Sequence, residues 1–277
     1  MAHHIATILS KSENHSDALL NSRLPLWEAY CPQVFFEYLE ALNLVKGSPI
    51  DFNHINNILL SKSGFTLSPT QDYLPPHNYL FELSEKRFPI ATQMRTLDDD
   101  GFSVLPDLIH DLFCHVPWLL HPEFMKFFSA MGQLFIKAVR RAKDIYPIED
   151  QPRILNSNAL AISRCFWFTV ENGLIEEQGQ RKAYGAAILS STEQLSHTFN
   201  NNVFVSPFKT EHIIQRPCNP SSLQTTFFII HEFSELNNIS EKMQCFLEEG
   251  QLDFIVFGPH DIYYQDIIYF LNDRVLS

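Results

Sequence analysis

The chain has 277 residues, of which 45% are hydrophobic and 19% are charged, a composition typical of a globular protein with a sizeable apolar core. Its 32 acidic residues outnumber its 20 basic ones, and the net charge of −12 disfavours nucleic acid or an anionic membrane as the main partner. No apolar run reaches the ~18 residues of a membrane span. The five cysteines form no Cys-x-x-Cys pair, which indicates reduced thiols in a cytoplasmic protein.

The first part of the chain is expected to be helical after a polar start. Residues 1–22 predict a loosely ordered lead-in, and residues 23–277 predict a single domain. Within residues 31–44, apolar side chains recur at steps of three and four, which predicts an amphipathic helix. Asp51 is expected to cap a second helix, and Gly64 is expected to end it.

The middle of the chain combines proline-rich turns with helical patterns. Residues 68–78 contain three prolines and predict an ordered loop. A short helix is expected at 79–87 and a strand at 88–95. The longest helical pattern covers residues 122–141, and another helix is expected at 158–174.

The last part of the chain predicts shorter elements. A turn is expected at Gly179, followed by strands at 212–215 and 225–230 and a helix at 240–249. Taken with the earlier elements, this pattern predicts an α+β fold that is mostly helical with a few short strands.

Two histidines in the sequence PDLIHDLFCHVP are the first candidates for a metal site. His110 and His115 are five residues apart, so on an ideal α-helix they would lie roughly 140° from one another. They therefore differ from the zinc-protease pattern, in which two histidines four residues apart share a face. Pro117 is expected to move Val116 out of the helical region, which would re-aim His115 at the end of a helix.

Glu171 is the candidate third ligand. It lies in a run of bulky residues, RCFWFTVENGL, where an unpaired buried carboxylate would be costly. The alternative is an exposed glutamate on the outer face of its helix. Two histidines and a carboxylate form the facial triad of non-haem Fe(II) oxygenases, but catalytic zinc also uses these ligands, so the residue types leave iron and zinc open.

Three stretches of the chain together resemble one known family. PDLIHDLFCHVP, FWFTVENGL and KAYGAAILSS, in this order, resemble the pterin-dependent aromatic amino acid hydroxylases, above all the short bacterial phenylalanine hydroxylases. The resemblance extends upstream through YLFELSEKRFPIATQMR, and it fades before residue 25 and after residue 235. It implies the catalytic-domain fold of that family without a regulatory domain or a tetramerisation helix, and hence a monomer or weak dimer.

The resemblance implies a specific chemistry. One Fe(II) would be held by His110, His115 and Glu171, with a tetrahydropterin such as tetrahydrobiopterin as cosubstrate. The enzyme would use O2 to hydroxylate L-phenylalanine to L-tyrosine, placing the second oxygen atom on the pterin. Three ligands on one side of the metal would leave its other side open for oxygen and the cosubstrate.

The resemblance also implies roles for the residues around the metal. Arg95 would hold the substrate carboxylate with its planar guanidinium, and Asp107 would pair with Arg95 or orient His110. Without the resemblance, Arg95 would be read as a surface residue. The implied substrate-binding residues are Arg95, Pro106, Asp107, Trp167 and Ser190. The implied pterin-binding residues are Leu74, Tyr79, Leu80 and Asp111.

Several positions differ from the family pattern and leave the preferred substrate open. Cys114 replaces a glycine beside the second histidine and is expected to be prone to oxidation. Asn172 replaces an aromatic residue and is expected to make the pocket wall more polar, and Ala187 replaces a glycine that faces the substrate. Tryptophan or tyrosine hydroxylation, or broad specificity, is therefore the main alternative. A zinc hydrolase and a non-catalytic binder are weaker alternatives.

Overall fold

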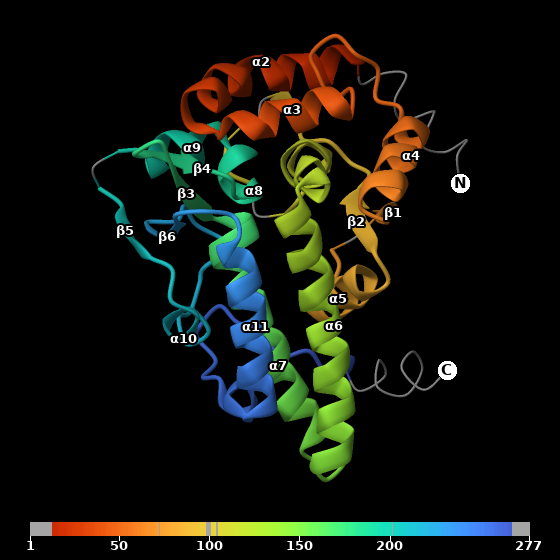
Figure 1. Ribbon diagram of the computed structural model, residues 1–277, viewed down its shortest axis with the longest axis vertical. Coiled ribbons are helices and arrows are strands. Elements are labelled where there is room, and N and C mark those ends of the chain that lie inside the picture. The colour runs from red at the N-terminus through yellow and green to blue at the C-terminus, as the bar shows by residue number, and fades with distance from the viewer. Residues whose placement is uncertain (1–12, 72, 98–100, 104, 201, 268–277) are drawn as a thin grey trace.

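The computed structural model describes residues 13–71, 73–97, 101–103, 105–200 and 202–267. Three helices, α6, α7 and α11, run along the long axis of the molecule, and α2 and α3 lie across one end (Figure 1). The α-helices are α2 (Glu13–Tyr30), α3 (Gln33–Ala41), α4 (Phe52–Lys62), α5 (Pro76–Ser84), α6 (Pro122–Ile145), α7 (Gln151–Phe166), α8 (Ala186–Leu189), α9 (Thr192–Thr198), α10 (Thr210–Ile213) and α11 (Glu235–Glu248). The described residues also include two π-helices, η2 (Ile109–His115) and η4 (Trp167–Glu171), and the 3-10 helices η3 (Val116–Leu120) and η5 (Gln251–Phe254).

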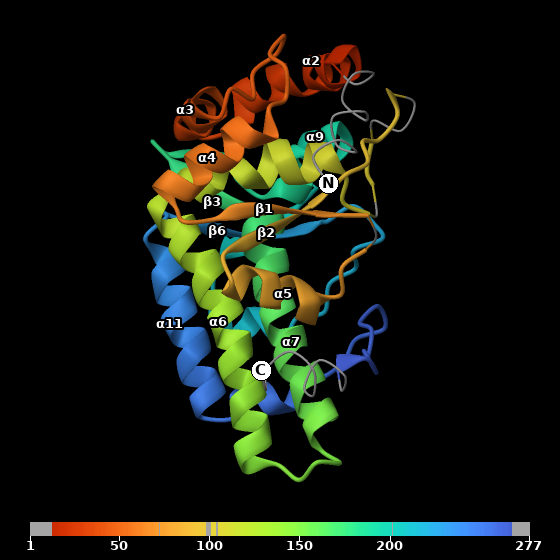
Figure 2. The same ribbon diagram turned by 90° about the vertical axis from the view of Figure 1, so that its right-hand side faces the viewer.

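In the described part of the chain, the strands form two small sheets. Their bounds are β1 (Thr66–Thr70), β2 (Arg87–Ala91), β3 (Gly173–Glu177), β4 (Gln180–Ala183), β5 (Phe204–Pro207) and β6 (Thr226–Ile230). β1 and β2 pair in parallel, and Figure 2 shows them running between α4 and α5. The other sheet has the order β4-β3-β6-β5, in which only the β3–β4 pair is antiparallel. This architecture confirms the prediction of a mostly helical α+β fold with a few short strands.

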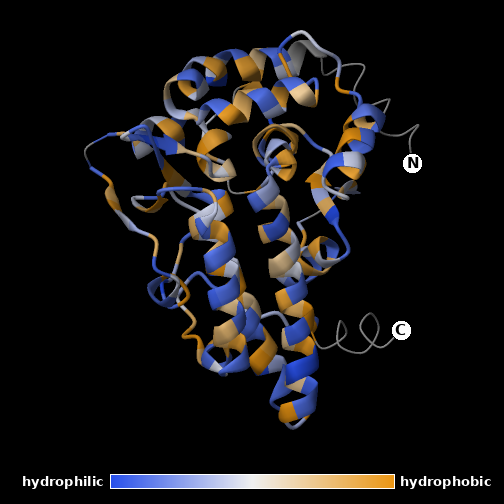
Figure 3. Cartoon of the chain, viewed as in Figure 1, coloured by the Kyte–Doolittle hydropathy of each residue, from blue (hydrophilic) through white to orange (hydrophobic). Residues whose placement is uncertain are grey.

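The long helix α6 supports much of the core. Hydrophilic and hydrophobic residues alternate along it, as expected of a helix with one buried face (Figure 3). A β-carbon at Gly132 would collide with the backbone of Leu83 and Ser84, so the glycine lets α5 approach α6 closely. α5 carries Tyr79 and Leu80, and this contact therefore fixes two of the predicted pterin-binding residues.

Most of the predicted helices and strands are confirmed. The helix predicted at 31–44 is α3, and the Asp51 side chain caps α4 by accepting hydrogen bonds from the backbone N–H groups of Asn53 and His54. The long helix at 122–141 is α6, and the strand at 225–230 is β6. The helix predicted at 240–249 begins earlier, at Glu235.

Several predictions about local structure are wrong. The loop predicted at 68–78 overlaps β1, which ends at Thr70, and α5, which begins at Pro76. Residues 1–12 of the predicted lead-in lie outside the described residues, but residues 13–22 are helical and belong to α2, because Leu19 and Leu20 are buried against the core. The strand predicted at 212–215 is instead the end of α10 and its cap, since a short apolar run does not distinguish a strand from a buried helix.

One cluster of buried apolar residues extends from Leu19 to Ile267. Among the described residues, no helix has both the length and the apolar character needed to cross a membrane.

Candidate active site

The two histidines lie on a π-helix, η2. In such a helix the backbone hydrogen bonds join residues five apart, so His110 and His115 lie on the same side despite their spacing. The expected break before Pro117 is wrong: Val116 keeps helical angles (φ −58°, ψ −38°), and Pro117 sits in the first turn of η3, where its missing N–H is tolerated. The π geometry, and not the proline, therefore aligns the two imidazoles.

Glu171 also ends a π-helix, η4, which continues α7. The backbone N–H of Asn172 donates to the carbonyl of Trp167 at 3.0 Å, the five-residue spacing of this wider turn. A β-carbon at Gly185 would collide with the Glu171 carbonyl, so this glycine lets the start of α8 approach η4. The close approach brings Ser190, at the end of α8, toward the metal-ligand candidates.

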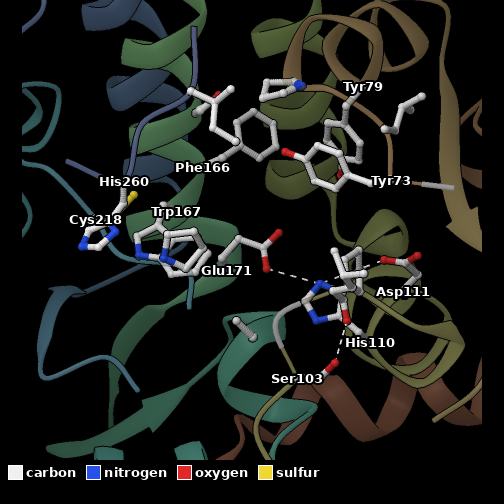
Figure 4. A pocket seen from close by; sticks show the side chains of 18 of the residues that line it. Tyr73, Tyr79, Ser103, His110, Asp111, Phe166, Trp167, Glu171, Cys218 and His260 are labelled. Atoms are coloured by element: carbon white, nitrogen blue, oxygen red, sulfur yellow. Dashed lines mark hydrogen bonds and ion pairs between the residues drawn. The ribbon is translucent and has the colours of Figure 1, made fainter. Parts of the chain in front are cut away.

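The side chains of His110, His115 and Glu171 converge. Their candidate ligand atoms all lie within 4.8 Å of one another, and this is the cluster among the described residues that could hold a metal ion. One Glu171 oxygen lies 3.0 Å from Nε2 of His115, and the other lies 3.3 Å from Nε2 of His110. Figure 4 shows the Glu171 carboxylate directed at His110 within the cavity. The predicted proximity of these three residues is thus confirmed, and their role as ligands stays a prediction.

The donor chemistry of this cluster fits a divalent cation. Burial disfavours charge on both partners, but the histidines hold the pKa of Glu171 well below its usual range, and Glu171 raises the pKa of His110. Nδ1 of His110 lies 3.1 Å from the Ser190 hydroxyl oxygen. If Nδ1 carries the proton and its N–H donates a hydrogen bond to this oxygen, the lone pair of Nε2 is free to bind a metal.

Arg95 and Asp107 form a buried ion pair beside the histidines. Nε and Nη2 of Arg95 donate to the two carboxylate oxygens of Asp107 at 3.0 and 2.8 Å. The backbone N–H of His110 also donates to this carboxylate, at 3.1 Å, but Nδ1 of the His110 ring lies against Ser190. The structure therefore shows the predicted pairing of Asp107 with Arg95, and no contact of Asp107 with the His110 ring is among those of the described residues. Burial would raise the pKa of Asp107, but the hydrogen bond and charge of Arg95 lower it overall. Arg95 is only 7% exposed, which excludes the surface alternative.

These residues surround a cavity of about 340 Å³. Every predicted site residue lines it except Asp107, which lies behind Arg95. Trp167 faces the cavity, so its alternative as a plain core residue is excluded, and its indole Nε1 is buried without a hydrogen-bond partner among the described residues.

The predicted pterin-binding residues occupy one side of the cavity. Tyr79 and Leu80 come from α5, and the Tyr79 ring makes an edge contact with Phe166 at a centroid distance of 6.1 Å. Asp111 accepts a hydrogen bond from the backbone N–H of Ala91 at 2.6 Å. Burial raises the pKa of Asp111 to about 6.

Two of the unusual residues behave differently from the expectation. Asn172 is 1% exposed and does not line the cavity, because its amide turns inward and donates to the Trp167 carbonyl at 3.1 Å. Cys114 is fully buried, and burial raises the pKa of its thiol, which disfavours the reactive thiolate and hence the expected oxidation. Ala187 lines the cavity as expected.

One part of the cavity was missed by the sequence reasoning. The residues concerned are Tyr73, Phe102, Ser103, Cys218, His260, Asp261, Ile262 and Tyr264. Four of them lie after residue 235, where the resemblance found in the sequence fades. Figure 4 shows Cys218 and His260 beside Trp167, on the side away from Asp111.

Two polar residues of α7 hold this late part of the chain against the cavity. Arg164 donates to the Asp261 carboxylate at 2.7 Å and to the Val256 carbonyl at 2.8 Å. Asn156 accepts from the backbone N–H of Tyr264 at 2.8 Å and donates to its carbonyl at 3.1 Å. Buried polar residues on a helix signal such partners, but the sequence does not reveal which distant segment supplies them.

Comparison with known proteins agrees with this geometry. A probable aromatic amino acid hydroxylase from Chlamydia pneumoniae is 45% identical over 237 residues, which cover 86% of this chain and 65% of that protein, so the chain spans slightly less than two thirds of this relative. Tryptophan 5-hydroxylase from Xenopus laevis is 30% identical over 200 residues, or 72% of this chain and 38% of that protein.

A solved structure and the family comparison extend the agreement to the fold. Phenylalanine hydroxylase from Chromobacterium violaceum, solved with bound oxidised Fe(III), superposes with a TM-score of 0.75 at 26% identity and covers 92% of this chain and 88% of that one. Residues 26–268 match the family described as biopterin-dependent aromatic amino acid hydroxylase. The resemblance found in the sequence is therefore confirmed, and this chain belongs to the biopterin-dependent aromatic amino acid hydroxylase family.

Proposed function

We propose that this protein is an iron- and tetrahydropterin-dependent monooxygenase that hydroxylates free L-phenylalanine to L-tyrosine with O2. The observation that carries the proposal is the cluster of His110, His115 and Glu171, whose ligand atoms lie within 4.8 Å of one another on the wall of a cavity that Arg95 also lines. The cavity thus combines a site for a redox metal with the guanidinium of Arg95, a cation suited to an amino acid carboxylate.

The choice of iron rests on the ligand set and the family. Two imidazoles and one carboxylate leave coordination positions open, as in the non-haem Fe(II) oxygenases. When bound, the iron supplies the chemistry that activates O2 with electrons from the pterin. In this chain, Ser190 would keep the His110 proton on Nδ1, so that Nε2 faces the metal. Zinc hydrolysis is disfavoured because the family is one of hydroxylases.

Arg95 would anchor the substrate by its carboxylate. Its Nη1 atom donates to the carbonyls of Gly101 and Ser190, at 3.1 and 2.9 Å. A substrate carboxylate would exchange with the Gly101 carbonyl, and Asp107 would hold the guanidinium in place during this exchange. Pro106 and Trp167 would then confine the aromatic ring beside the metal and exclude water from it.

The pterin would lie on the side of the cavity formed by α5 and the loop before it. Tyr79 offers an aromatic ring there, and Leu74 and Leu80 offer apolar contacts. The Asp111 carboxylate accepts from Ala91 through one oxygen, and its other oxygen would accept from the N–H groups of the pterin, directly or through water.

Phenylalanine is the preferred substrate in this proposal, and tryptophan or tyrosine is the alternative. The similarity to named relatives does not decide between them, since the identities to a tryptophan and a phenylalanine hydroxylase are 30% and 26%. The methyl group of Ala187 narrows the cavity relative to glycine, which favours the smaller ring. We further propose a cytoplasmic enzyme that acts as a monomer or weak dimer and binds neither nucleic acid nor membranes.

A product assay tests the proposal. The protein is loaded with Fe(II), supplied with tetrahydrobiopterin and O2, and given phenylalanine, tyrosine or tryptophan separately. We expect pterin-dependent formation of tyrosine from phenylalanine, with the highest kcat/KM of the three substrates. Hydroxylation of none of them would refute the enzymatic function, and a higher kcat/KM for tryptophan would establish the alternative.

A further inference from the structure

Arg23 is a fully buried arginine of α2, three residues before the part of the chain that matches the family. Its Nε and Nη2 atoms donate to a single acceptor, the backbone carbonyl of Ser190, at 3.0 and 2.7 Å. Nη1 donates to the Leu19 carbonyl within α2 at 2.8 Å, which ties the guanidinium to its own helix. A helix that crosses the end of the molecule (Figure 1) thus contacts a residue of the candidate active site directly.

Ser190 connects this helix to both halves of the site. Its carbonyl also accepts from Nη1 of Arg95 at 2.9 Å, so two guanidinium groups converge on one oxygen. Its hydroxyl lies 3.1 Å from Nδ1 of His110. The last carbonyls of a helix lack partners within it, and Ser190 follows α8 directly, so its orientation depends on such outside donors.

We propose that Arg23 is a positioning residue for the metal centre and the substrate anchor, an inference that rests on the proposed function. Two N–H groups of a planar guanidinium fix both the position and the direction of the Ser190 carbonyl. The Ser190 hydroxyl then meets His110, and the carbonyl holds Arg95 in line with the cavity. A lysine, which presents one nitrogen in place of the two of the guanidinium, would satisfy the carbonyl without fixing its direction.

Trp27 provides a matched control on the same helix. Its indole Nε1 donates to the Leu189 carbonyl at 2.9 Å, so it makes the same kind of contact between α2 and α8, one residue earlier. Leu189 contributes no side chain to the cavity. If the contact between α2 and α8 were purely structural, substitutions of Trp27 and of Arg23 would therefore have equal effects on the active site.

The test compares Arg23→Lys and Trp27→Phe with the wild type. Affinity for Co²⁺ is measured by absorbance titration of the metal-free proteins, and kcat and KM for phenylalanine are measured after loading with Fe(II). We expect Arg23→Lys to raise the Kd for Co²⁺ about 3- to 10-fold, below the effect of a direct partner of a ligand, and to raise KM more than it lowers kcat. Trp27→Phe should lower the Tm without changing the Kd for Co²⁺ or KM for phenylalanine.

A double-mutant cycle with Ser190→Ala establishes the route of the effect. If Arg23 acts on His110 through the Ser190 hydroxyl, Arg23→Lys should change the Kd for Co²⁺ little in the Ser190→Ala background. Additive effects, equal effects of Arg23→Lys and Trp27→Phe, or an unchanged Kd and KM in Arg23→Lys would overturn the proposal.

The same measurements separate this inference from the proposed function. Wild-type protein that binds Co²⁺ but makes no hydroxylated product refutes the enzymatic function and leaves the Kd comparison valid. Wild-type protein that binds no Co²⁺ refutes the metal centre, and the inference falls with it.

Discussion

Two sides of the cavity are held in place by different forces. The polar wall (Arg95, His110, Glu171 and Ser190) is a chain of hydrogen bonds and ion pairs, with distances between 2.9 and 3.3 Å. The aromatic wall (Tyr73, Phe166, Trp167 and Tyr264) is built from rings on separate segments, one of which is fixed mainly through its backbone by Asn156.

This difference predicts how each wall responds to change. Hydrogen bonds in a buried network are strong and directional, so the loss of one member disturbs its neighbours. Ring contacts are weaker and tolerate small shifts of position. The polar wall is therefore expected to fix the reacting groups, while the aromatic wall is expected to set the size and access of the cavity. The predictions below test that contrast.

Among the substitutions proposed, Glu171→Gln should have the largest effect, a loss of metal binding. The substitution replaces the one anionic ligand candidate with a neutral amide, whose N–H₂ group repels a cation. We expect the Kd for Fe(II) or Co²⁺ to rise at least about 100-fold, because partners of metal ligands alone account for about 10- to 100-fold. Metal titration and hydroxylation assays measure the effect.

Glu176→Gln is its control, because Glu176 is an exposed carboxylate at the fourth position of the adjoining strand, β3. This control variant should bind metal like the wild type. Normal metal binding by Glu171→Gln would remove Glu171 from the metal site and leave the polar wall without its anionic member.

Arg95→Lys should have the next largest effect and act mainly on KM. Lysine keeps the charge beside Asp107 but loses the fork that meets a carboxylate at two points. A hydrogen bond to a charged group contributes about 1.5–3 kcal/mol, so KM for phenylalanine should rise about 10- to 100-fold. Steady-state kinetics at saturating pterin measure the change.

Arg87→Lys controls for the loss of a forked ion pair elsewhere. Nε and Nη2 of Arg87 contact the Glu82 carboxylate at 2.7 and 3.1 Å, outside the cavity. We expect the kcat and KM of Arg87→Lys to equal those of the wild type. An unaltered KM in Arg95→Lys would show that the substrate carboxylate binds elsewhere.

The polar wall could be predicted from the sequence, and its backbone geometry could not. The residues of PDLIHDLFCHVP and FWFTVENGL identified the ligand candidates through their resemblance to a family. The π-helix that aligns His110 with His115 was missed, because side-chain periodicity assumes the regular α-helical turn. The extra residue per turn is stabilised by tertiary packing, which leaves no local pattern in the sequence.

The aromatic wall was only partly predicted, for a different reason. Phe166 and Trp167 lie within the recognised stretch FWFTVENGL, but Tyr264 reaches the cavity through Asn156, 108 residues away along the chain. The same applies to Arg23, which was placed just after the expected lead-in and lies 167 residues from Ser190. Long-range hydrogen bonds of this kind depend on the fold as a whole, and residue type alone indicates only that a partner exists.

Asn156→Ala should affect both stability and the aromatic wall, more weakly than the changes above. It removes two hydrogen bonds to the backbone of Tyr264, and each should cost about 1–3 kcal/mol if the freed group stays buried. A looser Tyr264 should raise KM for the pterin or the amino acid without a comparable loss of kcat. Thermal unfolding and steady-state kinetics measure the two effects.

Ser157→Ala is a close control for this variant. The Ser157 hydroxyl also holds the late part of the chain, by donating to the Leu252 carbonyl and accepting from the Ile255 N–H, but these residues do not line the cavity. It should lower the Tm while leaving both KM values unchanged. Equal kinetic effects of the two variants would mean that the aromatic wall responds to global stability and not to the position of Tyr264.

Tyr264→Phe should have the smallest effect and gives the sharpest test of the contrast. The Tyr264 hydroxyl lies 3.1 Å from that of Tyr73, a residue that is 54% exposed, so water can replace this hydrogen bond. Its net contribution should be at the low end of about 0.5–1.5 kcal/mol, and KM should change less than about threefold. The ring itself stays in place, because Asn156 holds the backbone. A tenfold change would show that the two hydroxyls control entry to the cavity, and the aromatic wall would then depend on a specific polar contact just as the polar wall does.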